Sequence, residues 1–302
     1  MRLNINTIFD KLLSEGIKIK AERVILHVAI ISFIFHLLLI YLKDFNIIFI
    51  RSENVLLTNP ISAIYTPFSF ILVYEVYILV YYLSKSITIY IGKQYEIITL
   101  IIIRRVFKDL SILKLSSDWF RIKDDIKFTY DIIASIILFY LLFLFYSKSR
   151  KSIAVIPQQK ELPDSINQYI KFKKIISILL VPVLLSLAIY SFTRWALPSF
   201  SNSINAANEF KNINNIFFDE FFKILIIVDV IVLLMSFFYT DEFHKVIRNS
   251  GFIISTILIR LSFSIDGIMN TVLIVLSVVF GLIVLLIHNE YEKLANKSIL
   301  KT

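Results

Sequence analysis

The sequence predicts an all-α fold, a polytopic integral membrane helix bundle with about six to eight membrane segments and short amphipathic surface helices. Hydrophobic residues make up 57% of the 302 residues, more than a soluble domain of this length carries. A membrane-spanning helix needs about 20 mostly apolar residues. At least five apolar runs approach this length, at 27–42, 129–146, 173–192, 222–239 and 268–287. Residues 1–302 are therefore expected to form a single transmembrane domain.

The N-terminal segment 1–22 is predicted to be an amphipathic helix that lies along the membrane surface. Ile5, Ile8 and Leu12 recur at helical spacing, and lysines lie among and after them. Many polar residues precede the first apolar run and no small-residue cleavage site follows it, so this run is expected to be retained as a span. Its basic flank favours an N-terminus on the inside.

The stretch 61–103 is about twice as long as one bilayer crossing. Lys85, Lys93 and Glu96 interrupt its second half. Two arrangements are open: a span at about 62–83 that continues as a bent interfacial helix, or a second, charge-bearing segment at about 87–103 that crosses or re-enters the membrane. Loop charge does not decide between them, because basic segments lie on both sides of the predicted span that follows.

These two basic segments, 104–127 and 148–172, are predicted to be surface connectors. The first begins with an amphipathic helix at 104–115, in which Arg105 and Asp109 are four residues apart and can pair. Such a helix fits the surface of a leaflet that contains anionic lipid. The candidate lipid contacts are Arg104, Arg105 and Lys108.

The C-terminal segment 252–287 is predicted to be a short leg followed by a full span. The leg, 252–265, would be only about 21 Å long as a helix, at 1.5 Å per residue. Gly251 and Gly267 flank it. We expect that this leg fails to reach the far side of the membrane, whereas 268–287 crosses fully.

Glu75 is the first candidate for a functional residue at membrane depth, where ionisable groups are costly and usually functional. It lies beside a polar stripe on one helix face, formed by Tyr74, Tyr77, Tyr81 and Lys85. The functional interpretation is a polar seam between helices that binds a proton or a cation. The structural interpretation is an ion pair with an Arg or Lys from another helix.

Asp229 and Arg260 are the other candidates for this seam. Asp229 lies near the middle of the run 222–239 and shares a face with Ser236. An unpaired carboxylate there would be protonated or would need a cation close by. Arg260 lies among hydroxyl side chains, where it either lines a cavity or extends to the headgroups. Because a lipid-facing carboxylate is costly, we expect Glu75 and Asp229 to face the bundle interior and at least one to approach a basic group or a polar cavity.

The sequence predicts no metal site and no cofactor. Cysteine is absent, which excludes disulfides, thiolate metal sites and a cysteine nucleophile. The histidines form no ligand motif: His27 and His36 lie on different sides of one helix, and His244 and His288 lie near the ends of separate apolar runs. The net charge of +9 fits the basic loops of a membrane protein, so nucleic acid is not an expected partner.

These features favour a small ion, proton or solute channel or transporter whose charged residues line the polar seam. Two alternatives stay open: a non-catalytic membrane subunit or scaffold, and a membrane-embedded lipid-modifying enzyme that uses Glu75 or Asp229 as a general base. No catalytic motif in the sequence supports an enzyme. The expected location is the bacterial inner (cytoplasmic) membrane. The expected partners are the lipid bilayer, with anionic lipid at the basic surface helices; a homo-oligomer or another membrane protein is left open.

Overall fold

The computed structural model describes residues 5–47, 60–112, 123–153, 164–200, 213–239, 242–265 and 267–299, and every regular element in these ranges is a helix. This confirms the all-α prediction. In chain order the α-helices are α1 (Ile5–Leu13), α2 (Glu15–Asp44), α3 (Tyr65–Leu83), α4 (Ile87–Ile112), α5 (Lys123–Ile153), α6 (Asp164–Phe200), α8 (Ile213–Phe237), α9 (Phe243–Phe263) and α10 (Ile268–Ile299). A short 3₁₀ helix, η2 (Pro60–Ile64), precedes α3.

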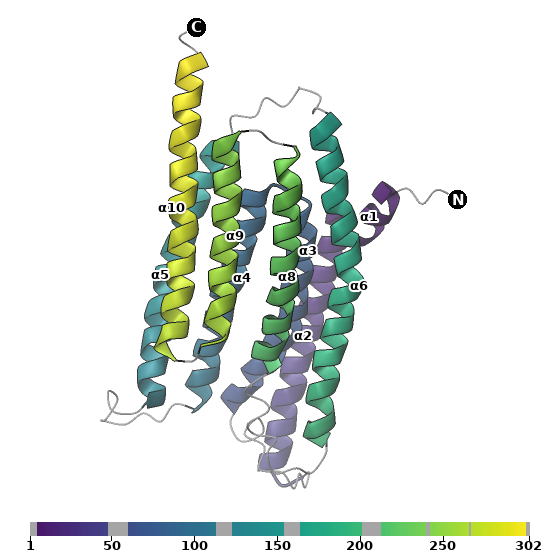
Figure 1. Cartoon of the computed structure of the whole chain (residues 1–302). Helices are drawn as coiled ribbons and strands as arrows, with labels where there is room; N and C mark the ends of the chain where they lie inside the picture. Colours follow the sequence, from purple (N-terminus) through teal and green to yellow (C-terminus); the bar gives the residue numbers. More distant parts are fainter. Residues whose placement is uncertain are drawn as a thin grey trace.

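Figure 1 shows the long helices running side by side in two layers. α2, α3, α4 and α5 form one layer, and α6, α8, α9 and α10 form the other, and within each layer consecutive helices contact each other. The layers contact each other through α3 and α6, α4 and α9, and α5 and α10. α1 packs on the outside against α6 and lies at the same end of the bundle as the C-terminal end of α10.

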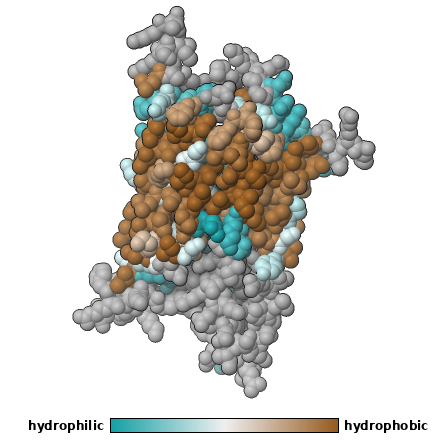
Figure 2. All heavy atoms as spheres, viewed as in Figure 1, coloured by the Kyte–Doolittle hydropathy of each residue, from teal (hydrophilic) through white to brown (hydrophobic). Residues whose placement is uncertain are grey.

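Five segments in the described part of the chain are long and apolar enough to cross a membrane: the segment Ile5–Asp44 that includes α2, and the apolar parts of α3, α5, α9 and α10. Their outward faces expose large apolar side chains, for example Ile31, Phe143 and Leu276. Figure 2 shows apolar residues gathered in a broad band around the middle of the bundle, with hydrophilic residues mostly towards its ends. Such a band is costly in water and is covered by lipid in a bilayer. The structure therefore supports an integral membrane protein.

The stretch 61–103 forms two separate helices, not one bent helix. α3 ends at Leu83 and α4 begins at Ile87, so the charge-bearing segment is a helix of its own. In the turn between them, Lys173 Nζ of α6 donates to the backbone carbonyl of Lys85. This bond satisfies a backbone carbonyl of the turn, which lies outside both helices.

The prediction of a surface helix at 104–115 is wrong for the residues that the structure describes. α4 continues to Ile112 without a break, and Arg104 is buried. The helix stays in the bundle because Arg104 pairs there with Glu75 of α3, and a buried charge is tolerated when it is paired. Residues 113–122 of the predicted connector lie outside the described ranges.

The prediction of a short leg at 252–265 is also wrong. α9 begins at Phe243, and its 21 residues reach about 31 Å at helical rise, long enough to cross the hydrocarbon core of a bilayer. The polar residues before Phe252 form the first turns of the same helix. Gly267 has a φ of 78°, a conformation that suits glycine, in the tight turn that leads into α10.

Two further predicted boundaries differ from the structure. The amphipathic segment 1–22 is divided by Ser14, whose hydroxyl accepts from the Ile17 backbone N–H at 3.3 Å and caps α2. The predicted connector 148–172 is shorter, because α5 continues to Ile153 and α6 begins at Asp164. The residues between these two helices lie outside the described ranges.

Candidate functional site

Asp229 of α8 lies in the buried interior, where it meets side chains of α4 and α9. The Tyr90 hydroxyl donates to Asp229 Oδ1 at 2.9 Å, and Gln94 Nε2 donates to Oδ2 at 3.2 Å. The Thr256 hydroxyl of α9 donates to Gln94 Oε1 at 2.7 Å. All four residues are buried. Tyr90 and Gln94 thus donate directly to the Asp229 carboxyl group, and Thr256 is linked to it through Gln94.

The α4 sequence explains this arrangement. Tyr90 and Gln94 are four residues apart, so both lie on the same face of α4, the face that meets α8 and α9. A glutamine suits the central position because its amide group offers both donors and an acceptor. Gln94 therefore links the hydroxyl of α9 to the carboxyl group of α8.

Asp229 differs from two other buried acids in having only neutral hydrogen-bond donors. Within the described ranges, no basic side chain forms an ion pair with it. Glu75 pairs with Arg104, and both side chains are almost fully buried. Asp131 of α5 is fully buried and pairs with Arg105 at 2.5 Å. The bundle therefore matches the charges of Glu75 and Asp131 and leaves the charge of Asp229 unmatched.

The Arg105 guanidinium joins α4, α5 and α10 near the start of α10, and this start lies at the end of the bundle opposite to α1 (Figure 1). Its Nε and Nη2 donate to the two carboxylate oxygens of Asp131 at 2.5 and 2.6 Å, in the two-pronged geometry that suits arginine. It also donates to Asn270 and Thr271 of α10, each at 2.5 Å. The predicted pair with Asp109 is wrong within the described ranges, where Asp109 Oδ2 lies 3.4 Å from Lys127 Nζ instead.

The candidate lipid contacts also differ from the prediction. Arg104 and Arg105 serve as ion-pair partners inside the bundle, not as surface contacts. The side chain of Lys108 lies outside what the structure describes.

The tyrosine stripe of α3 faces the N-terminal helices. The Tyr74 hydroxyl donates to Glu22 of α2 at 2.8 Å, and the Tyr77 hydroxyl donates to the backbone carbonyl of Leu12 in α1 at 3.0 Å. The Tyr81 ring lies 5.3 to 5.4 Å from two lysine ammonium groups, those of Lys18 and Lys85. This stripe therefore holds α1 and α2 against the bundle.

Glu75 and Asp229 both face the interior, each with 4% of its surface exposed, and Glu75 approaches a basic group, which confirms both of these expectations. They lie in separate networks, however, and not in one seam. Ser236 donates to the Leu233 carbonyl of its own helix at 2.7 Å. Arg260 is partly buried on α9, and within the described ranges neither Glu75 nor Asp229 is its partner.

Tyr90, Gln94 and Thr256 were not predicted as site residues, because a search for charged residues passes over neutral polar ones. The sequence does contain one signal for this site: Tyr90 and Gln94 are polar residues at i, i+4 spacing in the segment 87–103, so they lie on one helix face. The same segment contains an ion pair between residues three positions apart: Lys93 Nζ lies 2.7 Å from Glu96 Oε2.

A second polar link joins α4 to the α9–α10 hairpin. The Ser255 hydroxyl donates to the Ser277 carbonyl at 2.7 Å, so Tyr95 is the donor in its own 2.7 Å bond to Ser255 Oγ. The Tyr95 hydroxyl sits directly over Gly281 of α10, where the missing side chain leaves room for it.

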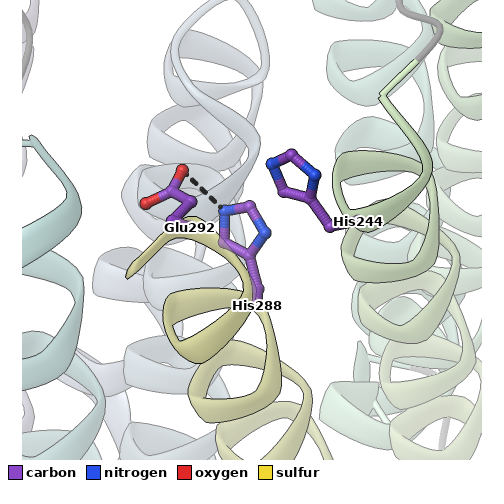
Figure 3. Close-up of side chains that lie close together, drawn as sticks. All are labelled: His244, His288 and Glu292. Carbon is purple, nitrogen blue, oxygen red and sulfur yellow. Dashed lines mark ion pairs between the residues drawn. The ribbon is translucent and has the colours of Figure 1, made fainter. Parts of the chain in front are cut away.

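The fold also brings together two histidines that lie 44 positions apart in the sequence. The rings of His244 in α9 and His288 in α10 stack at 5.2 Å between centroids, and Glu292 Oε1 lies 3.1 Å from His288 Nε2 (Figure 3). The expectation of scattered histidines is wrong, because the antiparallel α9–α10 hairpin places the start of one helix beside the end of the other.

The pKa of Glu242, just before α9, is lowered, chiefly by its hydrogen bond from Lys245 and further by the positive charge of Lys245.

No protein-family model, curated protein or solved structure matches this chain.

Proposed function

We propose that this chain is a membrane transport protein, a small channel or carrier, in which the Asp229 carboxyl group binds a proton during passage across the bundle. The observation that carries the proposal is the neutral surrounding of Asp229. Its hydrogen-bond donors are Tyr90 and Gln94, whereas Glu75 and Asp131 have arginine partners. A bundle that neutralises Glu75 and Asp131 with arginine and gives Asp229 no basic partner among the described residues provides a site for a positively charged occupant.

A charge without a counter-charge is costly in the interior of a membrane protein. A buried carboxylate without a counter-charge is unfavourable, so it takes up a proton or holds a cation. A proton removes the unmatched charge, and each carboxyl oxygen still has a lone pair for it beside the hydrogen bond that it accepts. A monovalent metal cation is the second possible occupant, with oxygen ligands from Asp229, Tyr90 and Gln94.

The test is a flux assay in proteoliposomes with an imposed proton gradient and a pH-sensitive dye inside. We expect the parent protein to dissipate the gradient and Asp229→Asn to slow this by about tenfold or more, because asparagine keeps the shape but cannot exchange a proton. Glu220→Gln is the matched control: Glu220 lies on the same helix in a half-exposed pair with Lys223, and its loss should leave the flux unchanged. Sodium and potassium gradients form two further arms of the assay.

Two results would overturn the proposal. One is a parent protein that moves neither protons nor sodium nor potassium, and the other is an Asp229→Asn variant that is as active as the parent. If the parent moves only sodium or potassium and Asp229→Asn abolishes this flux, the ion that binds at Asp229 is that cation and not a proton.

A non-catalytic membrane subunit or scaffold is the second candidate function. The closed ion pairs favour it, because Glu75–Arg104 and Arg105–Asp131 join α3, α4 and α5 as fixed structural links. Absence of flux in the parent would support this candidate. No observation favours a lipid-modifying enzyme, since Glu75 is held by Arg104 and Asp229 lies far along α8 from its start at Ile213.

A further inference from the structure

We propose that His244, His288 and Glu292 form a binding site for a divalent transition-metal ion, Zn²⁺ in the first instance. The three side chains come from the start of α9 and the end of α10, and their candidate ligand atoms all lie within 4.8 Å of one another. Figure 3 shows the two imidazole rings and the carboxylate gathered in the space between the two helices. This proposal does not depend on transport at Asp229.

The donor set matches the chemistry of zinc. Imidazole nitrogen and carboxylate oxygen are preferred zinc ligands, and three protein ligands leave a fourth position for water or another group. Two ligands on a tetrahedral zinc ion lie roughly 3.3 Å apart when the bonds are about 2.0 to 2.1 Å long. His288 Nε2 and Glu292 Oε1, one helical turn apart on α10, are 3.1 Å apart. This pair already has the separation that a bound metal requires.

The contact with Arg248 shows which nitrogen of the His288 ring is available to a cation. Arg248 Nη1 lies 2.9 Å from His288 Nε2. An arginine guanidinium can only donate, so this ring nitrogen must present a lone pair. The lone pair and the Glu292 oxygen are two electron-rich atoms side by side, an arrangement that needs a cation nearby. In this structure the Arg248 guanidinium supplies the positive charge.

The second ring nitrogen, Nδ1, then carries the ring proton, because a neutral imidazole has one donor and one acceptor nitrogen. His288 is buried, with 1% of its side chain exposed. Nε2 is therefore the ring atom that can bind a metal ion, and it already lies beside the Glu292 oxygen.

Arg248 would compete with a metal ion for His288 Nε2. A metal ion would displace Nη1 from His288, while Arg248 could keep its bonds from Nε and Nη2 to Asn249 Oδ1, which are 3.2 and 3.1 Å long. Removal of the guanidinium charge should therefore strengthen metal binding. A cluster with a purely structural role would behave differently, because it would lose a stabilising partner and gain no affinity for metal.

The experiment measures Zn²⁺ binding to the detergent-solubilised, tag-free chain after removal of metal with a chelator. The chain has no cysteine, so thiolates cannot contribute. We expect about one equivalent of Zn²⁺ by mass spectrometry and a Co²⁺ complex with visible absorption bands. His244→Ala and Glu292→Gln should weaken binding at least about tenfold in competition with a chromogenic chelator, and Arg248→Gln should strengthen it by a similar factor.

The control is His27→Ala, which removes an exposed histidine of α2 that contacts only the Arg23 backbone carbonyl among the described residues. This variant should bind Zn²⁺ as the parent does. Glu292→Gln should fold as the parent does, because Glu292 is about one-third exposed. A loss of Zn²⁺ binding in this variant therefore reports on the ligand and not on folding. Equal binding in parent, His244→Ala and Glu292→Gln, no binding in the parent, or no gain in Arg248→Gln would each overturn the proposal.

Discussion

Within the bundle, the Glu75 and Arg104 side chains are 5% and 4% exposed and neutralise each other. Such a pair offsets the cost of burying its own charges and contributes little beyond that, but each charge depends on the other. Arg105 and Asp131 repeat the pattern one residue further along α4. At the scale of single residues, α4 thus carries the cations that allow carboxylates on α3 and α5 to remain buried.

This dependence predicts the effect of removing one partner. Glu75→Gln should lower the free energy of unfolding by about 3 to 5 kcal/mol, because the buried Arg104 guanidinium loses the carboxylate charge that faces it. The double variant Glu75→Leu/Arg104→Met should recover most of this loss. Denaturation in mixed detergent and SDS measures both, with Glu220→Gln as a half-exposed control that changes stability by less than about 1 kcal/mol. A Glu75→Gln variant as stable as the parent would contradict the structural role of the pair.

The sequence was sufficient to predict that Glu75 and Asp229 face inward, because the alternative places a charge in lipid. It could not identify their partners. Arg104 lies 29 positions from Glu75, and which basic group a buried acid meets depends on the register of α3 against α4. Tyr90, Gln94 and Thr256 carry no charge, so no cost argument singles them out before the fold brings them together.

Among the helices, α10 meets α4 closely at Gly281, where the Tyr95 side chain of α4 occupies the space of a Cβ atom. A Cβ atom at Gly281 would overlap the Tyr95 hydroxyl and lie 2.7 Å from Tyr95 Cζ and 3.3 Å from Ser255 Oγ. The tyrosine is fully buried and hydrogen-bonded to Ser255, so it has no free space to move into. Gly281 is thus a packing requirement at the junction of three helices.

Gly281→Ala should therefore destabilise the protein by about 1 to 3 kcal/mol, the usual cost of overpacking a core. The double variant Gly281→Ala/Tyr95→Phe should recover part of this loss, because it removes the overlapping hydroxyl. Thermal unfolding in detergent measures both, and Gly16→Ala in α2 is the control, since a Cβ there meets no atom within 4 Å. Equal stability of Gly281→Ala and the parent would contradict the observed packing.

The apolar runs predicted the existence of the helices well, but not their limits. Hydropathy detects the faces that contact lipid, whereas α4 and α9 extend through polar residues whose partners lie on other helices. Arg104 and Arg105 stay in α4 because of Glu75 and Asp131. The start of α9 stays helical beside α10, where Arg248 donates to His288. These contacts link residues far apart in the sequence, so no local pattern could place the helix ends.

For the whole molecule, the ion pairs change the distribution of charge that sets membrane orientation. Arg104 and Arg105 form ion pairs with Glu75 and Asp131 within the helix bundle. They are therefore not counted among the loop charges on the side opposite to α1 when the positive-inside rule is applied. The end that carries α1, the start of α6 and the start of α9 remains rich in lysine, for example at Lys11, Lys171 and Lys245. The positive-inside rule then favours the cytoplasmic side for this end.

We therefore predict that the two ends of α9 lie on opposite sides of the membrane. In this cysteine-free chain, Glu242→Cys and Ser264→Cys place single thiols at exposed positions just before and just after α9. With an impermeant thiol reagent on intact cells, Ser264→Cys should react, whereas Glu242→Cys should react only after permeabilisation, as should Lys85→Cys in the α3–α4 turn. The reverse pattern would keep α9 as a span and invert the orientation. Reaction of Glu242→Cys and Ser264→Cys from the same side would mean that α9 does not cross, because a helix of 21 residues that spans the hydrocarbon core cannot present both ends to one face.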